Sequence, residues 1–172
     1  MTIHVTTAYI TGKCSLGCPY CYSWKRLGYN MPQDVMEQMC IYLNASGFTR
    51  SGPVLQELKL WGGEPLEYPE GLKFVLGHAR PRKFTITTNG LNLTPDMFEW
   101  LRFHAVEIAL SWDGTKDSQD QGRQNSYDKL KPNIEYWRTL IAENGGQILK
   151  TVAIPENLYA DVEEIYNAGF ER

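Results

Sequence analysis

The sequence has no excess of basic residues and no long apolar run. Its 172 residues include 17 lysines and arginines against 20 aspartates and glutamates, and the formal net charge is -3. Because no basic tract could follow a phosphate backbone, nucleic acid is not expected as a partner. No apolar stretch approaches the roughly 20 residues needed to cross a membrane, so no membrane association is expected either.

The features of a secreted protein are also missing. The N-terminal residues MTIHVTTAYITGKC have neither the cationic start nor the long apolar centre of a secretory signal. The four cysteines make a poor disulfide framework, because Cys14, Cys18 and Cys21 are crowded into one short segment. These absences favour a cytoplasmic protein whose cysteines bind metal.

The chain has no low-complexity stretch and no Pro/Gly linker, so residues 1–172 are expected to form a single domain. The sequence repeats one kind of unit five times: an apolar run of strand length, then a turn, then a segment with helical spacing of apolar residues. This alternation predicts an α/β fold with a parallel sheet, and five units predict a partial, open βα barrel, since a closed eightfold barrel needs about 250 residues. The chain stops where a sixth strand is expected, which leaves open whether it is truncated. The predicted strands are residues 5–11, 55–61, 83–88, 106–112 and 148–154.

Helix signals lie between the predicted strands. Pro32 falls in the first turn of one helix, Thr94 and Pro95 begin another, and the pair Gly145 and Gly146 follows a third. Apolar residues at helical spacing should pack on the sheet. They are Val35, Met36, Met39 and Leu43 in the first helix, and Leu130, Ile134, Trp137 and Ile141 in the third.

The three clustered cysteines come directly after the first predicted strand. Their thiolates should therefore project from the carboxyl edge of the sheet, where parallel α/β folds place their chemistry. Three cysteines can ligate three irons of a [4Fe-4S] cluster and leave the fourth iron open to a reacting molecule. The alternative is a zinc-binding module, which would need a fourth ligand. Cys40 is the remaining cysteine, and its apolar helical setting predicts a small buried hydrophobe.

Polar and glycine residues mark the ends of the next three predicted strands. Glycines let a backbone approach a ligand closely, a carboxylate accepts hydrogen bonds from an ammonium group, and an arginine grips a carboxylate with two donors. One parallel sheet would gather all of these residues at one end. They are Gly62, Gly63 and Glu64 after the second strand, Thr88 and Asn89 after the third, and Ser111, Asp113 and Arg123 after the fourth.

Together these motifs resemble the radical S-adenosylmethionine (SAM) superfamily over residues 5–160. The resemblance rests on CxxxCxxC with the aromatic Tyr20 before the last cysteine, on the GGE motif and on the TNG motif. Ser-x-Asp-Gly from Ser111, with Arg123 following, is similar to the peptide- and protein-modifying branch, which includes the sulfatase maturases and SPASM proteins. The Cys-rich C-terminal extension with auxiliary clusters that is usual in that branch is missing from this sequence.

The resemblance implies a [4Fe-4S] cluster on the three cysteines and SAM as the second cofactor. It places Tyr20 near the adenine, Glu64 on the methionyl amine, and Ser111 with Arg123 on the carboxylate. The backbone at Val152 would pass along the adenine. The resemblance places the remaining motif residues at the border of the same SAM site; they are Gly62, Gly63, Thr88, Asn89 and Asp113.

The activity implied by the family is reductive cleavage of SAM to a 5'-deoxyadenosyl radical that removes a hydrogen atom from a substrate. The branch implies a peptide or protein side chain as substrate, and the family implies an external electron donor of the flavodoxin or ferredoxin type. A glycyl-radical-enzyme activating protein is one alternative, and a non-catalytic iron-sulfur or zinc-binding module or fragment is another.

Overall fold

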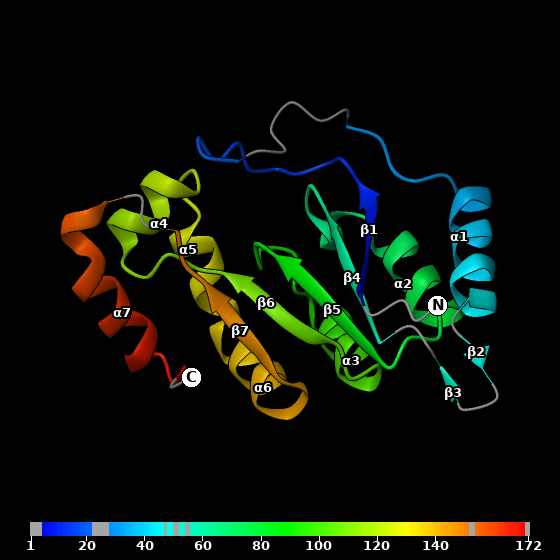
Figure 1. Ribbon diagram of the computed structural model, residues 1–172. Coiled ribbons are helices and arrows are strands. Elements are labelled where there is room, and N and C mark those ends of the chain that lie inside the picture. The colour runs from blue at the N-terminus through cyan, green and yellow to red at the C-terminus, as the bar shows by residue number, and fades with distance from the viewer. Residues whose placement is uncertain are drawn as a thin grey trace.

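The computed structural model describes residues 5–21, 28–46, 48–49, 52–53, 56–151 and 154–170. Five parallel strands form one sheet in which the spatial order follows the chain order (Figure 1). A small antiparallel hairpin of β2 (Phe48–Thr49) and β3 (Gly52–Pro53) stands apart from it. The strands of the main sheet are β1 (Val5–Thr11), β4 (Glu57–Gly62), β5 (Lys83–Thr88), β6 (Glu107–Ser111) and β7 (Gly146–Leu149).

Helices connect the successive strands and cover one face of the sheet (Figure 1). In the described part of the chain, no helix is long and apolar enough to cross a membrane. The long helices are α1 (Gln33–Ser46), α2 (Pro69–His78), α3 (Pro95–Phe103), α6 (Ile134–Asn144) and α7 (Leu158–Asn167), the last of which lies beyond β7 in Figure 1. The short ones are η1 (Pro65–Glu67), α4 (Lys116–Gly122), α5 (Tyr127–Leu130), η2 (Lys131–Asn133) and η3 (Pro155–Asn157).

The hydrophobic core lies between the sheet and these helices. Alternate strand residues such as Leu58, Leu60 and Ile86 are fully buried against helix residues such as Leu72 and Trp137. This alternation is expected when one face of a sheet is apolar and the other is polar. The predicted fold class, an open βα barrel with a parallel sheet, is confirmed.

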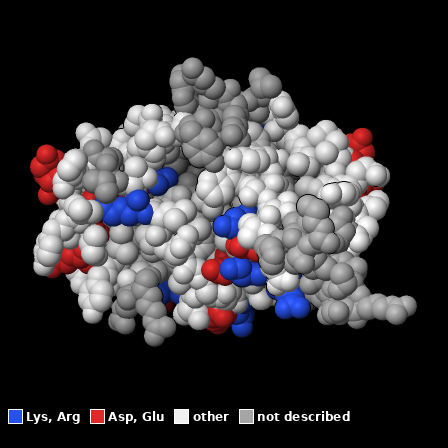
Figure 2. Space-filling view, in the orientation of Figure 1, with Lys and Arg blue, Asp and Glu red and all other residues white. Residues whose placement is uncertain are grey.

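A row of charged residues links three neighbouring strands near their amino ends. Lys83 on β5 forms ion pairs with Glu57 on β4, at 3.7 Å, and with Glu107 on β6, at 2.9 Å. On the face shown in Figure 2, basic and acidic side chains lie interspersed and form no stripe of one sign.

The fifth strand differs most from its prediction. It begins at Gly146, with only Gly145 between it and the end of α6. Gly146, with φ +154, allows the backbone to lie against Ile108, where a β-carbon would come within 2.2 Å of the Ile108 carbonyl oxygen. The strand ends at Leu149, since the Thr151 amide donates to the Asp113 carboxylate at 2.7 Å. Val152, predicted as an adenine contact, lies outside the described residues.

The predicted helix faces are correct in part. Met36, Cys40 and Leu43 form the buried stripe of α1, whereas Val35 is 47% exposed, so its assignment to the buried face is wrong. The buried Cys40 confirms the prediction of a small core residue. In the other predicted face Leu130 and Trp137 are buried and Ile134 and Ile141 are partly buried, but Leu130 belongs to α5 and the other three belong to α6.

Candidate functional site

The cysteine loop, residues 12–21, leaves β1 and crosses the carboxyl edge of the sheet (Figure 1). Three of the contacts that hold it there lie at successive points along the loop. The amide of Ser15 donates to Glu67 Oε1 at 2.6 Å, the peptide of Gly17 pairs with the side-chain amide of Gln124, and the hydroxyl of Tyr20 donates to Asp113 Oδ2 at 2.8 Å. The loop is therefore fixed to η1, just after β4, on one side and to the segment after β6 on the other.

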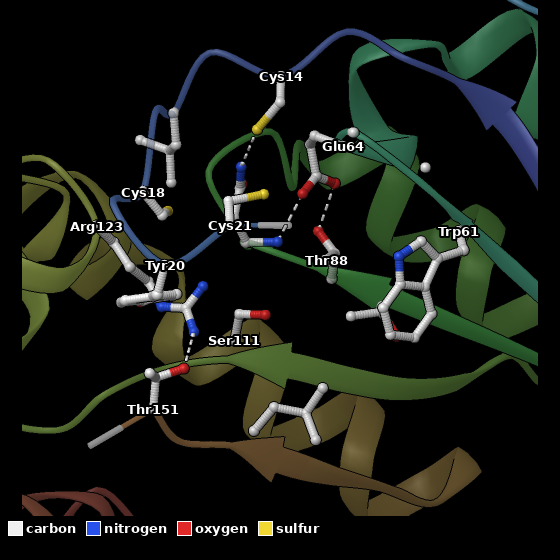
Figure 3. Close-up of a pocket in the computed structure, with 16 residues that line it drawn as sticks. Cys14, Cys18, Tyr20, Cys21, Trp61, Glu64, Thr88, Ser111, Arg123 and Thr151 are labelled. Atoms are coloured by element: carbon white, nitrogen blue, oxygen red, sulfur yellow. Dashed lines mark hydrogen bonds between the residues drawn. The ribbon is translucent and has the colours of Figure 1, made fainter. Parts of the chain in front are cut away.

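The three loop cysteines line one pocket with their thiols unpaired (Figure 3). Burial raises the pKa of Cys14 to about 11 and raises that of Cys18 as well, so these thiols must release protons when they bind metal. Among the described residues, no three His, Cys, Asp or Glu side chains are arranged to hold a single metal ion. In a [4Fe-4S] cluster each cysteine ligates a different iron, so the donor set fits a cluster better than one zinc ion.

Glu64 is buried beside the loop and accepts hydrogen bonds on both carboxylate oxygens. Oε1 accepts from the Leu66 amide at 3.0 Å and from the Thr88 hydroxyl at 2.6 Å, and Oε2 accepts from the Asn89 amide at 2.6 Å. Burial raises the pKa of Glu64 to about 7 even though these donors oppose the shift. A carboxylate has about four acceptor positions, so Glu64 retains room for one more donor, on Oε2.

Gly62 and Gly63 bring the end of β4 against the start of the cysteine loop. The amide of Gly63 donates to the Thr11 carbonyl at 2.8 Å, and the amide of Glu64 donates to the Lys13 carbonyl. A β-carbon at Gly63 would lie 2.0 Å from that Lys13 oxygen, so a larger residue does not fit. The sequence suggested that these glycines let the backbone approach a ligand closely. In the structure they let the end of β4 approach the cysteine loop.

Thr88 and Asn89 connect Glu64 to the cysteine loop. The Thr88 hydroxyl donates to Glu64 and accepts from the Gly90 amide at 3.1 Å. The side-chain amide of Asn89 points at Cys14 Sγ, 3.8 Å away. The GGE and TNG motifs are thus one hydrogen-bonded unit, although separate strands carry them.

Arg123 lies on the other side of the pocket in a buried ion pair with Asp113. Its Nε donates to Asp113 Oδ2 at 3.0 Å, and its Nη2 donates to Asp113 Oδ1 at 3.2 Å and to Thr151 Oγ1 at 3.4 Å. The guanidinium also lies 5.5 Å from the centre of the Tyr20 ring. In the described part of the chain Nη1 has no hydrogen-bond partner, which leaves two donors of a fixed cation for the pocket.

A third buried acid, Asp161 on α7, supports the turn that carries Asp113. It accepts hydrogen bonds from the Thr115 amide, the Ser118 hydroxyl and Lys150 Nζ, and the same Nζ donates to the Asp113 carbonyl at 2.6 Å. Gly114, with φ +103, passes so close to Asp161 that a β-carbon would lie 2.5 Å from its Cα. The helix α7 therefore packs directly on the turn after β6.

The structure brings nearly all of the predicted site residues to this pocket. Asp113 does not line the pocket, because it lies behind Arg123 and both of its carboxylate oxygens accept hydrogen bonds there. Five more of the described residues line the pocket without having been predicted, namely Leu16, Trp61, Thr87, Leu149 and Thr151. Of these, Trp61, Thr87 and Leu149 could have been indicated by their positions at strand ends. The predicted residues that line it are Cys14, Cys18, Tyr20, Cys21, Gly62, Gly63, Glu64, Thr88, Asn89, Ser111 and Arg123.

Comparisons with known proteins agree with this geometry. The chain is 28% identical over 137 residues to the serine-type anaerobic sulfatase-maturating enzyme of Bacteroides thetaiotaomicron, an alignment that covers 74% of this chain and 33% of the relative. Native anSMEcpe with bound S-adenosylmethionine has a similar structure, with a TM-score of 0.77, 19% identity and coverage of 98% of this chain and 50% of that one. SuiB of Streptococcus suis, bound to its precursor peptide SuiA, has a TM-score of 0.71, 18% identity and coverage of 97% and 36%.

The chain spans about a third of the sulfatase-maturating enzyme and about half of the anSMEcpe structure. The similarity to the sulfatase-maturating enzyme agrees with the branch that Ser-x-Asp-Gly and Arg123 predicted. The family match runs from residue 8 to residue 168 and includes every described element of the site. The chain therefore belongs to the radical SAM superfamily.

Proposed function

We propose that this chain is the catalytic core of a radical SAM enzyme that modifies a peptide or protein side chain. One observation carries the proposal: three unpaired thiols, a buried carboxylate and a guanidinium with free donors line a single pocket at the carboxyl edge of a parallel sheet. The thiols would hold a [4Fe-4S] cluster, and the remaining groups match the charges of an amino acid. The reducing environment of the cytoplasm would suit such a protein.

Each polar group has a defined task in this proposal. Arg123 offers its two Nη1 donors to the carboxylate of SAM, and the Ser111 hydroxyl, which faces the same pocket, adds a third (Figure 3). Glu64 accepts a proton of the methionyl amine on its remaining acceptor position. Tyr20, held by Asp113, presents its ring to the adenine.

Asp113 acts behind these contacts by fixing the guanidinium plane. Two hydrogen bonds in a fork leave Arg123 one orientation, so its free edge faces the pocket before any ligand arrives. When bound, the cluster supplies the electron that splits SAM into methionine and a 5'-deoxyadenosyl radical, which takes a hydrogen atom from the substrate. The role of the chain is to hold the cluster and SAM in a fixed position relative to each other.

A peptide substrate is supported by two relatives. One is a sulfatase-maturating enzyme, and the other is a structure of SuiB with its precursor peptide. The Ser-x-Asp-Gly turn and Arg123, which the sequence associates with that branch, lie together at the pocket. We further propose that a flavodoxin or ferredoxin supplies the electron.

The cysteine assignment is tested by reconstituting the chain with iron and sulfide without air. Replacing any one of Cys14, Cys18 or Cys21 by alanine should abolish the visible absorbance of the cluster, whereas Cys40→Ala, in the core of α1, should keep it. Wild-type chain that is loaded, reduced with dithionite and given SAM should release 5'-deoxyadenosine. A colourless wild-type protein, or a loaded one that yields no product, would refute the proposal.

Arg123→Lys tests the SAM contact without leaving Asp113 unpaired. Lysine keeps the charge but lacks the fork, and one charge-assisted hydrogen bond is worth about 1.5–3 kcal/mol, so SAM should bind about 10- to 100-fold more weakly while the iron content stays unchanged. Arg102→Lys in an exposed ion pair with Glu143 is the matched control and should have no effect on SAM binding. Equal SAM affinity in the two variants would remove Arg123 from the site.

A further inference from the structure

Gln124 makes a two-point contact with the middle of the cysteine loop. The Gly17 amide donates to Gln124 Oε1 at 2.6 Å, and Gln124 Nε2 donates to the Gly17 carbonyl at 3.2 Å. Gly17 lies directly before Cys18. A primary amide offers a donor and an acceptor side by side, as a neighbouring strand does, so it fixes the position and the tilt of this peptide.

The fit depends on residues at both ends of the contact. A β-carbon at Gly17 would lie 2.7 Å from Gln124 Nε2, so the amide reaches the peptide because position 17 has no side chain. On the other side, Gln124 and Asn125 both adopt left-handed backbone conformations, with φ of 51° and 55°. The left-handed region is unfavourable for most residues other than glycine; asparagine tolerates it, whereas glutamine has no special tendency to adopt it.

The backbone conformation at Gln124 directs neighbouring side chains to different targets. Arg123 faces Asp113 and the pocket, whereas Gln124 faces the cysteine loop. Strained backbone that persists beside a binding pocket is often kept for the side-chain placement it gives. The residue that carries the carboxylate-binding fork is thus covalently joined to the residue that anchors the loop.

We infer that Gln124 is a positioning residue that fixes the distance between the cluster-binding loop and Arg123. Gln124 does not line the pocket and acts through the Gly17 peptide. The Tyr20–Asp113 hydrogen bond joins the same two segments at a second point, so Gln124 determines how the loop is oriented about that contact. This inference rests on the proposed function, because it assigns a purpose to the loop only if the loop binds a cluster.

Two substitutions separate this role from a general role in folding. Gln124→Met keeps the length of the side chain and removes both hydrogen bonds. Gln124→Gly also removes them but relieves the left-handed backbone, so the metal-free Gln124→Gly variant should unfold at a higher urea concentration than Gln124→Met. Gln33→Met is the matched control, since Gln33 is an exposed glutamine that bonds within α1 to Glu37.

The measurements are the loss of iron from the reconstituted chain to a chelator, the dissociation constant of SAM, and hydrogen exchange of residues 14–21 in the metal-free chain. Both Gln124 variants should lose iron and exchange the loop amides about tenfold faster, as expected for two lost hydrogen bonds, and SAM should bind more weakly. Gln33→Met should match the wild type. Iron loss, SAM binding and exchange that are all unchanged would overturn the inference while leaving the proposed function intact. A wild-type chain that builds no cluster would overturn both.

Discussion

The buried ion pair between Arg123 and Asp113 should be far more important for stability than surface pairs of similar geometry. Asp113 is fully buried, the Arg123 side chain is 9% exposed, and the carboxylate also accepts hydrogen bonds from Tyr20 and Thr151. Asp113→Ala would leave the guanidinium without a counter-charge. Removing one partner of such a pair costs about 3–5 kcal/mol, a large part of the roughly 5–15 kcal/mol that stabilises a typical domain.

The assay is urea unfolding of the metal-free chain, followed by tryptophan fluorescence. With a slope of about 2 kcal/mol per M urea, Asp113→Ala should lower the midpoint by about 2 M. The control is Glu143→Ala, which breaks the pair with Arg102. That pair is shorter, 2.7 Å against 3.0 Å, but its side chains are 44% and 47% exposed, so the loss should be at most about 1 kcal/mol.

A double variant tests whether the uncompensated charge is the cause. If Asp113→Leu is combined with Arg123→Met, no charge is left buried, and part of the stability lost in Asp113→Ala should return. Equal losses in Asp113→Ala and Glu143→Ala would show that burial does not govern these pairs. A double variant no more stable than Asp113→Ala would show that the uncompensated charge is not the cause of the loss.

Two further predictions concern the end of β4. Gly63→Ala should lower the free energy of unfolding in urea by at least about 2 kcal/mol, because the new β-carbon would meet the Lys13 carbonyl oxygen. The control is Gly77→Ala, which has open space in α2 and should raise the free energy of unfolding by about 0.5–1 kcal/mol. A Gly63→Ala variant as stable as the wild type would contradict the contact. Because the pKa of Glu64 is raised from 4.5 to about 7 in the folded chain, about 3 kcal/mol of stability is present below pH 4.5 and lost as the pH rises through 7. Urea unfolding at several pH values should show this loss in the metal-free wild type and not in Glu64→Gln, and parallel pH profiles would refute it.

The sequence allowed the sheet and most of the pocket to be predicted, because each rests on a local pattern. Strands such as β1 and β5 have apolar alternation and clear ends, and the carboxyl ends of parallel strands lie together wherever the side chains point. The start of β7 was missed because a pair of glycines after a helix normally indicates a turn. Only the contact with Ile108 shows that Gly146 already belongs to the sheet.

The connections between motifs could not be predicted in the same way. That Thr88 donates to Glu64 depends on how β4 and β5 lie beside each other, which no local pattern records. The separation of Asp113 from the pocket and the contact between Gln124 and Gly17 depend on the path of the chain between β6 and α5. Such contacts join residues distant in sequence, so they become visible only when the fold is known.

The packing of α7 on the turn after β6 gives this peripheral helix an influence on a pocket that it does not line. Lys150 is bonded at once to the Asp113 carbonyl and to Asp161, so a shift of the helix would be transmitted through two hydrogen bonds to the residue that orients Arg123. At Gly114 the turn packs directly against Asp161 of α7, with no space for a side chain between them. A molecule that pressed on the outer surface of α7 would thereby shift Arg123 without ever entering the cavity.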